Sequence, residues 1–202
     1  MTKLIKSIAV TLLVLGYPLL VYMAITNGVS WIFPVVVGVI FFRRFRAGGE
    51  SSLFYGLVAL FLLGGAIFFQ NISAKMIPVL IHTSMFLVFY GSLRTDSSLI
   101  ERFARLDFPE LPPGIAEYCR NVTRVWVVFF ALNILFCTAL AIWADDALWA
   151  LYNGGIIYLL LGTMMVAEYI WRRIRYPWLE VPPLKQSMLN IIKNGHTVWN
   201  SK

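Results

Sequence analysis

The sequence predicts an all-α, polytopic integral membrane protein with six transmembrane helices arranged as three hairpins. The first observation behind this prediction is composition. Hydrophobic residues make up 59% of the 202 residues and charged residues only 13%. A soluble domain carries about a quarter charged residues, so this chain has too little polar surface to coat a water-soluble globule. Its apolar surface is therefore expected to face lipid.

The second observation is the one-sided distribution of positive charge. Of the 17 Lys and Arg residues, all except Lys75 fall in connections at the same side of the apolar runs. Basic connections stay in the cytosol under the positive-inside rule, which predicts that both termini are cytosolic. The net charge of +7 then indicates contact with anionic headgroups, worth about 1 kcal/mol per basic residue, and argues against a nucleic-acid partner.

The six expected spans follow from the lengths of the apolar runs, since a spanning helix needs about 20 residues. They comprise residues 8–25, 29–42, 52–69, 76–90, 125–143 and 147–170. The second run is short and contains Pro34, which leaves open whether it crosses the bilayer fully. The expected outer turns contain Lys75, Asp145 and Asp146, and every Arg falls on the inner side.

The whole chain, 1–202, is expected to form a single membrane domain with a cytosolic interfacial connection over 91–124 and a cytosolic tail over 176–202. Within the connection, apolar residues recur at helical spacing at Leu99, Ile100, Phe103 and Leu106. Ser98 and Glu101 match a capping box. This short helix could lie on the inner headgroup layer or pack on the bundle's own cytosolic face. A second apolar stripe, after Pro183, predicts a surface-lying segment in the tail.

Few polar side chains fall inside the expected spans, and each is a functional candidate because burying it in hydrocarbon is costly. Three of them are expected at similar depths in the last three helices and could line one polar cluster: His82, Asn133 and Asn153. Such a cluster could bind a ligand or a proton. The favoured alternative is hydrogen bonding between helices, worth about 0.6 kcal/mol per bond. Glu168 and Arg172 have the i, i+4 spacing of an interfacial ion pair.

Motifs for catalysis or metal binding are missing from the sequence. It contains no G-x-S-x-G, no H-E-x-x-H and no P-loop. Cys119 is the one plausible cytosolic thiol nucleophile, but neither histidine is placed by the sequence to serve as its base. The sequence therefore favours a protein without catalytic residues, metal or cofactor. The basic residues of the connection are the candidate contacts for headgroups or for an acidic partner: Arg94, Arg102, Arg105, Arg120 and Arg124.

Two stretches carry a resemblance to a known family. The first begins with Ser98-Leu99-Ile100-Glu101-Arg102-Phe103-Ala104-Arg105-Leu106 and continues through Leu111-Pro112-Pro113, Tyr118, Arg120 and Asn133. The second comprises Trp149-Ala150-Leu151-Tyr152-Asn153-Gly154 with Tyr158, Gly162, Glu168 and Arg172-Arg173. Together they resemble an uncharacterised family of small bacterial inner-membrane proteins, encoded in gene clusters for aryl-polyene-type or other fatty-acid-like polyketide lipids.

The resemblance implies an accessory or scaffold protein of the inner membrane that acts in the synthesis or export of a membrane-bound polyene or acyl lipid. Membrane lipids and an acyl carrier protein or acyltransferase are the partners that it implies. Two alternatives stay open: a small-molecule or lipid transporter (flippase), and a membrane-embedded acyl-transfer enzyme using Cys119 or His82. Glycine-rich faces on the third and sixth spans would permit a homo-oligomer.

Overall fold

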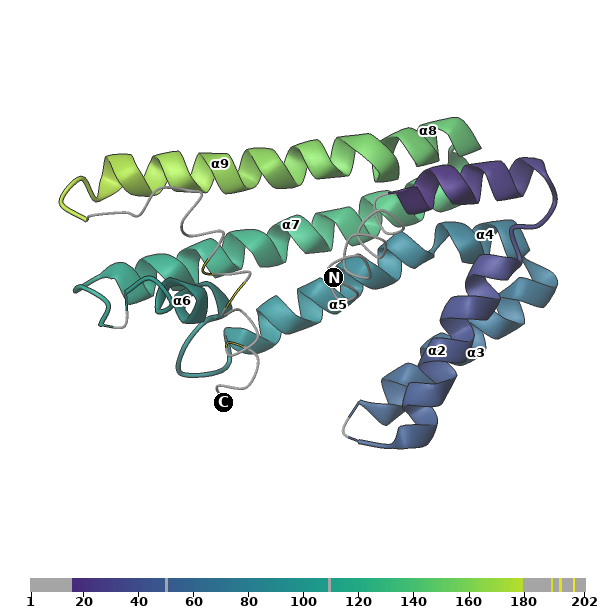
Figure 1. The fold of residues 1–202 in the computed structure, drawn as a ribbon, viewed down its shortest axis with the longest axis horizontal. Coiled ribbons are helices and arrows are strands. Elements are labelled where there is room, and N and C mark those ends of the chain that lie inside the picture. The colour runs from purple at the N-terminus through teal and green to yellow at the C-terminus, as the bar shows by residue number, and fades with distance from the viewer. Residues whose placement is uncertain are drawn as a thin grey trace. The chain divides into compact units, whose positions relative to one another are not determined.

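The computed structural model describes residues 16–49, 51–108 and 110–179, together with Asn190, Lys193 and Val198. These residues form helices and connecting turns, and none of them lies in a strand (Figure 1). The elements are a helix at Gly16–Thr26, α2 (Ile32–Ala47), α3 (Ser52–Phe68), α4 (Gln70–Lys75), α5 (Ile77–Ser92), α6 (Leu99–Ala104), α7 (Ile115–Trp143), α8 (Asp146–Leu151), the π-helix η1 (Tyr152–Ile156) and α9 (Ile157–Arg175). The start of the first expected span and the expected amphipathic segment of the tail lie outside the described residues.

Three continuous helical stretches within the described residues are long and apolar enough to cross a membrane. They are Gln70–Ser92, Ile115–Trp143 and Asp146–Arg175, with 23, 29 and 30 residues. They correspond to the fourth, fifth and sixth expected spans. The prediction of an all-α protein with membrane-spanning helices is confirmed to this extent, but the described residues supply three such helices where six were expected.

The three remaining runs form shorter helices within the described residues. Gly16–Thr26 and Ser52–Phe68 are apolar but fall short of 18 described residues. Helix α2 has 16 residues and includes three arginines in its last turns. Gly28 follows the first of these helices and Gly48 ends α2, and both have positive φ, 71° and 77°, a conformation that glycine adopts at little steric cost.

The chain divides into two compact units. Unit 1 comprises residues 1–80 and 135–159, and unit 2 comprises 81–134 and 160–202. In unit 1, α2 and α3 form an antiparallel hairpin (Figure 1) whose core includes Val58, Leu62 and Ile77. Glycines allow close approach here: a Cβ on Gly65 of α3 would lie 2.7 Å from the Ser73 Cβ of α4.

In unit 2, α6 packs against the beginning of α7, the second of the two placements that the sequence left open. Ile100 and Ala104 contact a core of Ile115, Cys119 and Leu179. The first N–H groups of α6, which have no partner within the helix, donate to neighbouring helices: Leu99 N–H to Ser92 Oγ at 3.0 Å and Ile100 N–H to Thr123 Oγ1 at 3.4 Å.

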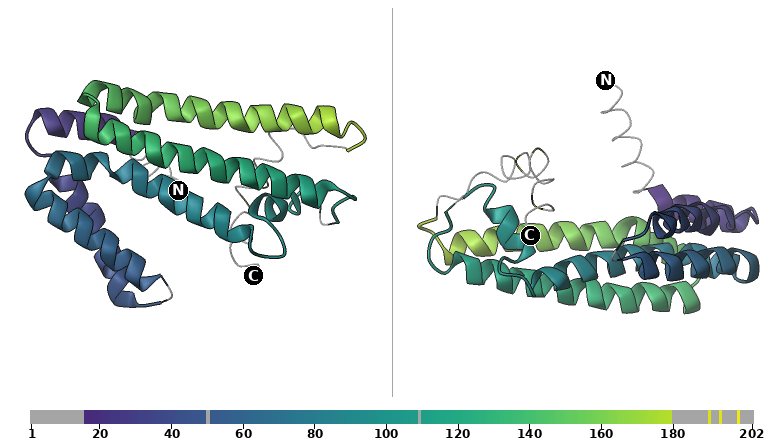
Figure 2. Two further views of the ribbon diagram at one scale, coloured as in Figure 1. Left: turned by 180° about the vertical axis from the view of Figure 1, so that it is seen from behind. Right: turned by 90° about the horizontal axis from the view of Figure 1, so that it is seen from below.

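The predicted reach of Glu101 back to the start of α6 is confirmed. The Ser98 N–H donates to Glu101 Oε2 at 3.3 Å, one half of a capping box. Within this unit the last turns of α9 run antiparallel to the first turns of α7 in both views of Figure 2. The connection between α5 and α7 and the end of α9 therefore meet at one end of unit 2.

Candidate functional site

A polar cluster that links several helices lies in unit 1 and begins with an ion pair. Lys75 Nζ, at the end of α4, lies 2.5 Å from Asp146 Oδ1, at the start of α8. The Lys75 side chain is only 8% exposed and that of Asp146 37%. Asp145 caps α8 by accepting the Leu148 N–H at 2.8 Å. The cap fixes the first turn of α8 and with it the position of Asp146.

A chain of hydrogen bonds continues from this ion pair into the helices. The fully buried Trp149 donates its Nε1–H to the Lys75 carbonyl at 3.2 Å. Asn153 Nδ2 donates to the Trp149 carbonyl at 2.9 Å, and Asn153 Oδ1 accepts the Cys137 thiol at 3.4 Å. We call Lys75, Asp146, Trp149, Asn153 and Cys137 the Lys75 network. It joins α4 to α7, α8 and η1, whose network residues lie more than 60 residues later in the chain.

Helix α4 also receives hydrogen bonds from the N-terminal part of unit 1. Tyr17 Oη donates to the Ala74 carbonyl at 2.7 Å, and the buried Ser30 hydroxyl donates to Asn71 Oδ1 at 2.5 Å. Segments next to the other two expected outer turns thus converge on this six-residue helix, which itself forms the middle one. That convergence is what three hairpins with their outer turns on the same side would produce.

The π-helix η1 gives the network an irregular backbone. Tyr152 and Asn153, its first two residues, are buried, and the Tyr152 ring packs against Phe136 at 4.8 Å between centroids. On the same turn a Cβ on Gly154 would meet Pro18 Cβ at 3.5 Å. Single π-turns inside α-helices are frequent at functional sites. Here the turn carries the asparagine that joins Cys137 to Trp149.

The three intramembrane polar residues predicted as a cluster are distributed over both units. Asn153 belongs to unit 1, whereas His82 and Asn133 belong to unit 2. Each asparagine donates to the carbonyl four residues earlier: Asn133 Nδ2 to Phe129 at 2.8 Å and Asn153 Nδ2 to Trp149. The buried His82 ring lies 6.0 Å from the Phe130 ring, and its Nδ1 has no hydrogen-bond partner among the described residues.

Glu168 and Arg172 lie together near the end of α9, with Arg172 Nε 3.4 Å from Glu168 Oε1. A third member comes from α7: Tyr118 Oη donates to Glu168 Oε1 at 3.2 Å. Sequence spacing gave no indication of Tyr118, which is 50 residues from Glu168 in the chain. The pair is therefore tied to the neighbouring helix.

The five arginines predicted as partner contacts all have hydrogen bonds within the chain. Arg120 is the most engaged: its guanidinium donates to the carbonyls of Leu93, Thr95 and Asp96 at 2.9 to 3.0 Å. The others bind Tyr90 (Arg94), Ser97 and Thr95 (Arg102), Glu101 (Arg105) and Asn121 (Arg124). Arg120 and Arg102 thus hold the connection after α5 in place.

Neither cysteine is arranged as a nucleophile. Cys119 is buried in an apolar core with Ile115 and Leu179, surroundings that disfavour the reactive thiolate. Cys137 is also buried and donates to Asn153. Within the described ranges no group of three His, Cys, Asp or Glu side chains could hold a metal ion. No family model, curated protein or solved structure matches the chain.

Proposed function

We propose that this chain is a multi-pass protein of the bacterial inner membrane that crosses the bilayer six times, with both termini in the cytosol. The apolar exposed face of α3 supports the proposal that the shorter helices also cross the membrane. Leu53 and Leu60 are 73% and 72% exposed, and Leu57, Phe61 and Ile67 are exposed as well. A 17-residue helix is about 26 Å long, close to the hydrocarbon thickness of about 30 Å. A small mismatch is accommodated by local thinning of the bilayer.

We expect cysteine labelling to give this topology. Asn27, Ser51, Asp96 and Ala147 are all exposed, so their accessibility depends on which side of the membrane they occupy. In intact cells a membrane-impermeant maleimide should label Asn27→Cys and Ala147→Cys. Ser51→Cys and Asp96→Cys should react only after the cells are opened. The native cysteines are buried and contribute little background. Labelling of Asp96→Cys in intact cells would contradict the topology.

Within that membrane we propose a non-catalytic accessory or scaffold role in the synthesis or export of a membrane-bound polyene or acyl lipid. The observation that supports a structural role is the Lys75 network, in which polar groups at helix ends and in the π-turn bond to other parts of the chain. The buried Cys119 argues in the same direction, because an acyl-transfer enzyme needs an accessible nucleophile. The lipid class comes from the resemblance of residues 97–175.

A co-purification experiment tests the role. The tagged full chain, extracted in mild detergent from cells that contain such a gene cluster, should retain an acyl carrier protein or an acyltransferase of that cluster. Cys119→Ala should leave formation of the lipid product unchanged, whereas deletion of the whole chain should lower it. Loss of product on Cys119→Ala in a variant that still folds would instead favour the enzyme, and absence of any cluster partner would contradict the scaffold.

A further inference from the structure

The arginines of unit 2 fall into two groups by their contacts. Those of the connection after α5, and Arg172, are bonded to other groups of the chain, as described above. Arg173 and Arg175 in the last turn of α9 are exposed, and neither forms an ion pair or hydrogen bond with the described residues. The Arg175 guanidinium instead lies 5.5 Å from the centroid of the Tyr176 ring. These two positive charges are therefore available to a partner.

Large apolar side chains are exposed beside these charges. Trp171 is 60% exposed, Ile174 69% and Trp178 58%. At 100° per residue, Trp171 and Ile174 are neighbours on one face of α9, with Arg175 next to Trp171 and Arg173 on the other side of Ile174. An apolar strip flanked by cations, with tryptophan at its edge, is typical of a helix end at a membrane interface.

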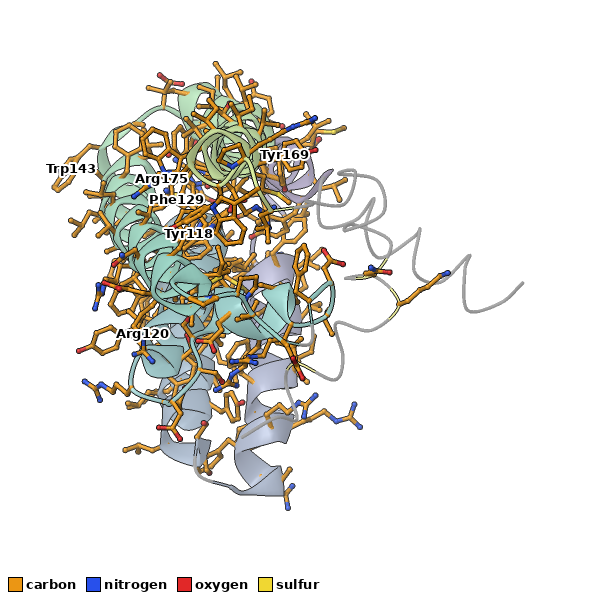
Figure 3. All side chains as sticks on the ribbon, turned by 90° about the vertical axis from the view of Figure 1, so that its left-hand side faces the viewer. Tyr118, Arg120, Phe129, Trp143, Tyr169 and Arg175 are labelled. Carbon is orange, nitrogen blue, oxygen red and sulfur yellow. The ribbon has the colours of Figure 1, made fainter. Side chains whose placement is uncertain are left out.

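The turn that follows α9 is fixed to the rest of unit 2. The Tyr176 ring packs edge-on against Tyr118 at 5.2 Å, and Leu179 is buried beside Ile115 and Cys119. The Trp178 ring packs edge-on against Tyr176 at 5.9 Å. Figure 3 views the molecule from the side on which α9 ends and labels Tyr118, Arg120 and Arg175. The contacts of Tyr176 and Leu179 therefore hold Trp178 and the last turn of α9 against the beginning of α7.

We propose that Trp171, Arg173, Ile174, Arg175 and Trp178, which we call the α9 cap, bind anionic phospholipid headgroups. The proposal rests on the membrane insertion proposed above. Guanidinium groups bind phosphate oxygens with paired, charge-assisted hydrogen bonds. The tryptophan rings are suited to the boundary between headgroups and acyl chains. The sequence predicted headgroup contacts at the arginines of the 91–124 connection, but these arginines form hydrogen bonds within the chain. The proposal therefore places lipid recognition at the end of α9.

Native mass spectrometry of the full chain tests the proposal, with phosphatidylglycerol and phosphatidylcholine as probes. The wild-type chain should retain phosphatidylglycerol in preference to phosphatidylcholine. R173Q/R175Q should lower the apparent affinity for phosphatidylglycerol by about 30-fold, as expected for loss of two headgroup contacts. The matched control R94Q/R124Q removes the same charge from exposed residues that bind Tyr90 and Asn121 and should retain the preference. R173K/R175K, which keeps the charge, should recover much of the affinity.

Equal loss in R173Q/R175Q and R94Q/R124Q would mean that net charge alone attracts the lipid, and would overturn the proposal. Unchanged phosphatidylglycerol binding in R173Q/R175Q would overturn the proposal as well. If the same variant no longer bound an acidic acyl carrier protein, the surface would be assigned to a protein partner. Carbonate extraction of wild-type membranes tests separately whether the chain is inserted in a membrane at all. A chain that stays in the pellet is inserted, whatever its lipid preference.

Discussion

Asp146→Asn should destabilise the protein by about 2 kcal/mol, because it leaves Lys75 charged, buried and without its carboxylate. Breaking a fully buried pair costs roughly 3–5 kcal/mol. The expected loss is smaller here because Asp146 is 37% exposed, whereas Lys75 is only 8% exposed. The measurement is the midpoint of thermal unfolding of the purified chain in detergent, with phosphatidylglycerol held constant so that lipid binding does not contribute.

The double substitution K75M/D146N supplies the control for this prediction. It removes the charge that Asp146→Asn leaves unpaired, and replacing both members of a buried pair by less polar groups is often close to neutral. The double variant should therefore be more stable than Asp146→Asn alone. If the two variants unfold at the same temperature, the ion pair does not couple α4 to α8 and the Lys75 network has no energetic role.

Gly65→Ala should destabilise unit 1 by about 1–3 kcal/mol, the usual cost of overpacking. The new methyl group would lie 2.7 Å from Ser73 Cβ and 3.1 Å from Ser73 Oγ. Ser73 is buried in α4 and its Cβ is attached directly to the backbone, so the clash cannot be relieved by rotating a side chain. Helix α4 would have to move away from α3, and the contacts of α4 with Tyr17 and Ser30 would be strained with it.

The neighbouring glycine is a matched control. A Cβ on Gly64 meets nothing within 4 Å, so Gly64→Ala should be neutral or stabilising by up to about 1 kcal/mol, the gain in helix propensity. Both substitutions bring the same propensity gain in the same helix, and their difference reports the close approach of α3 to α4. Equal unfolding midpoints for the two variants would contradict that approach.

Several features of the fold follow from local sequence. Long apolar runs predict the stretches Gln70–Ser92, Ile115–Trp143 and Asp146–Arg175, because helix length and hydropathy are properties of contiguous residues. The Ser98–Glu101 capping pair and the Glu168–Arg172 pair involve partners three and four residues apart, a spacing that a helix brings together wherever it lies. The shorter helices α2 and α3 follow the expected runs 29–42 and 52–69 to within five residues, because the turns at Gly28 and Gly48 on either side of α2 are local features as well.

The sequence by itself determined that this is a helical, lipid-compatible chain with a strongly asymmetric distribution of charge. Only the tertiary structure decided which polar groups are already bonded to the chain: Lys75 to Asp146, Tyr118 to Glu168, and Arg120 to the carbonyls after α5. Their partners are 24 to 71 residues away in the sequence, and residue spacing carries no information on such contacts. The physical reason is that helical periodicity sets which way a side chain faces, whereas packing between helices sets what it meets.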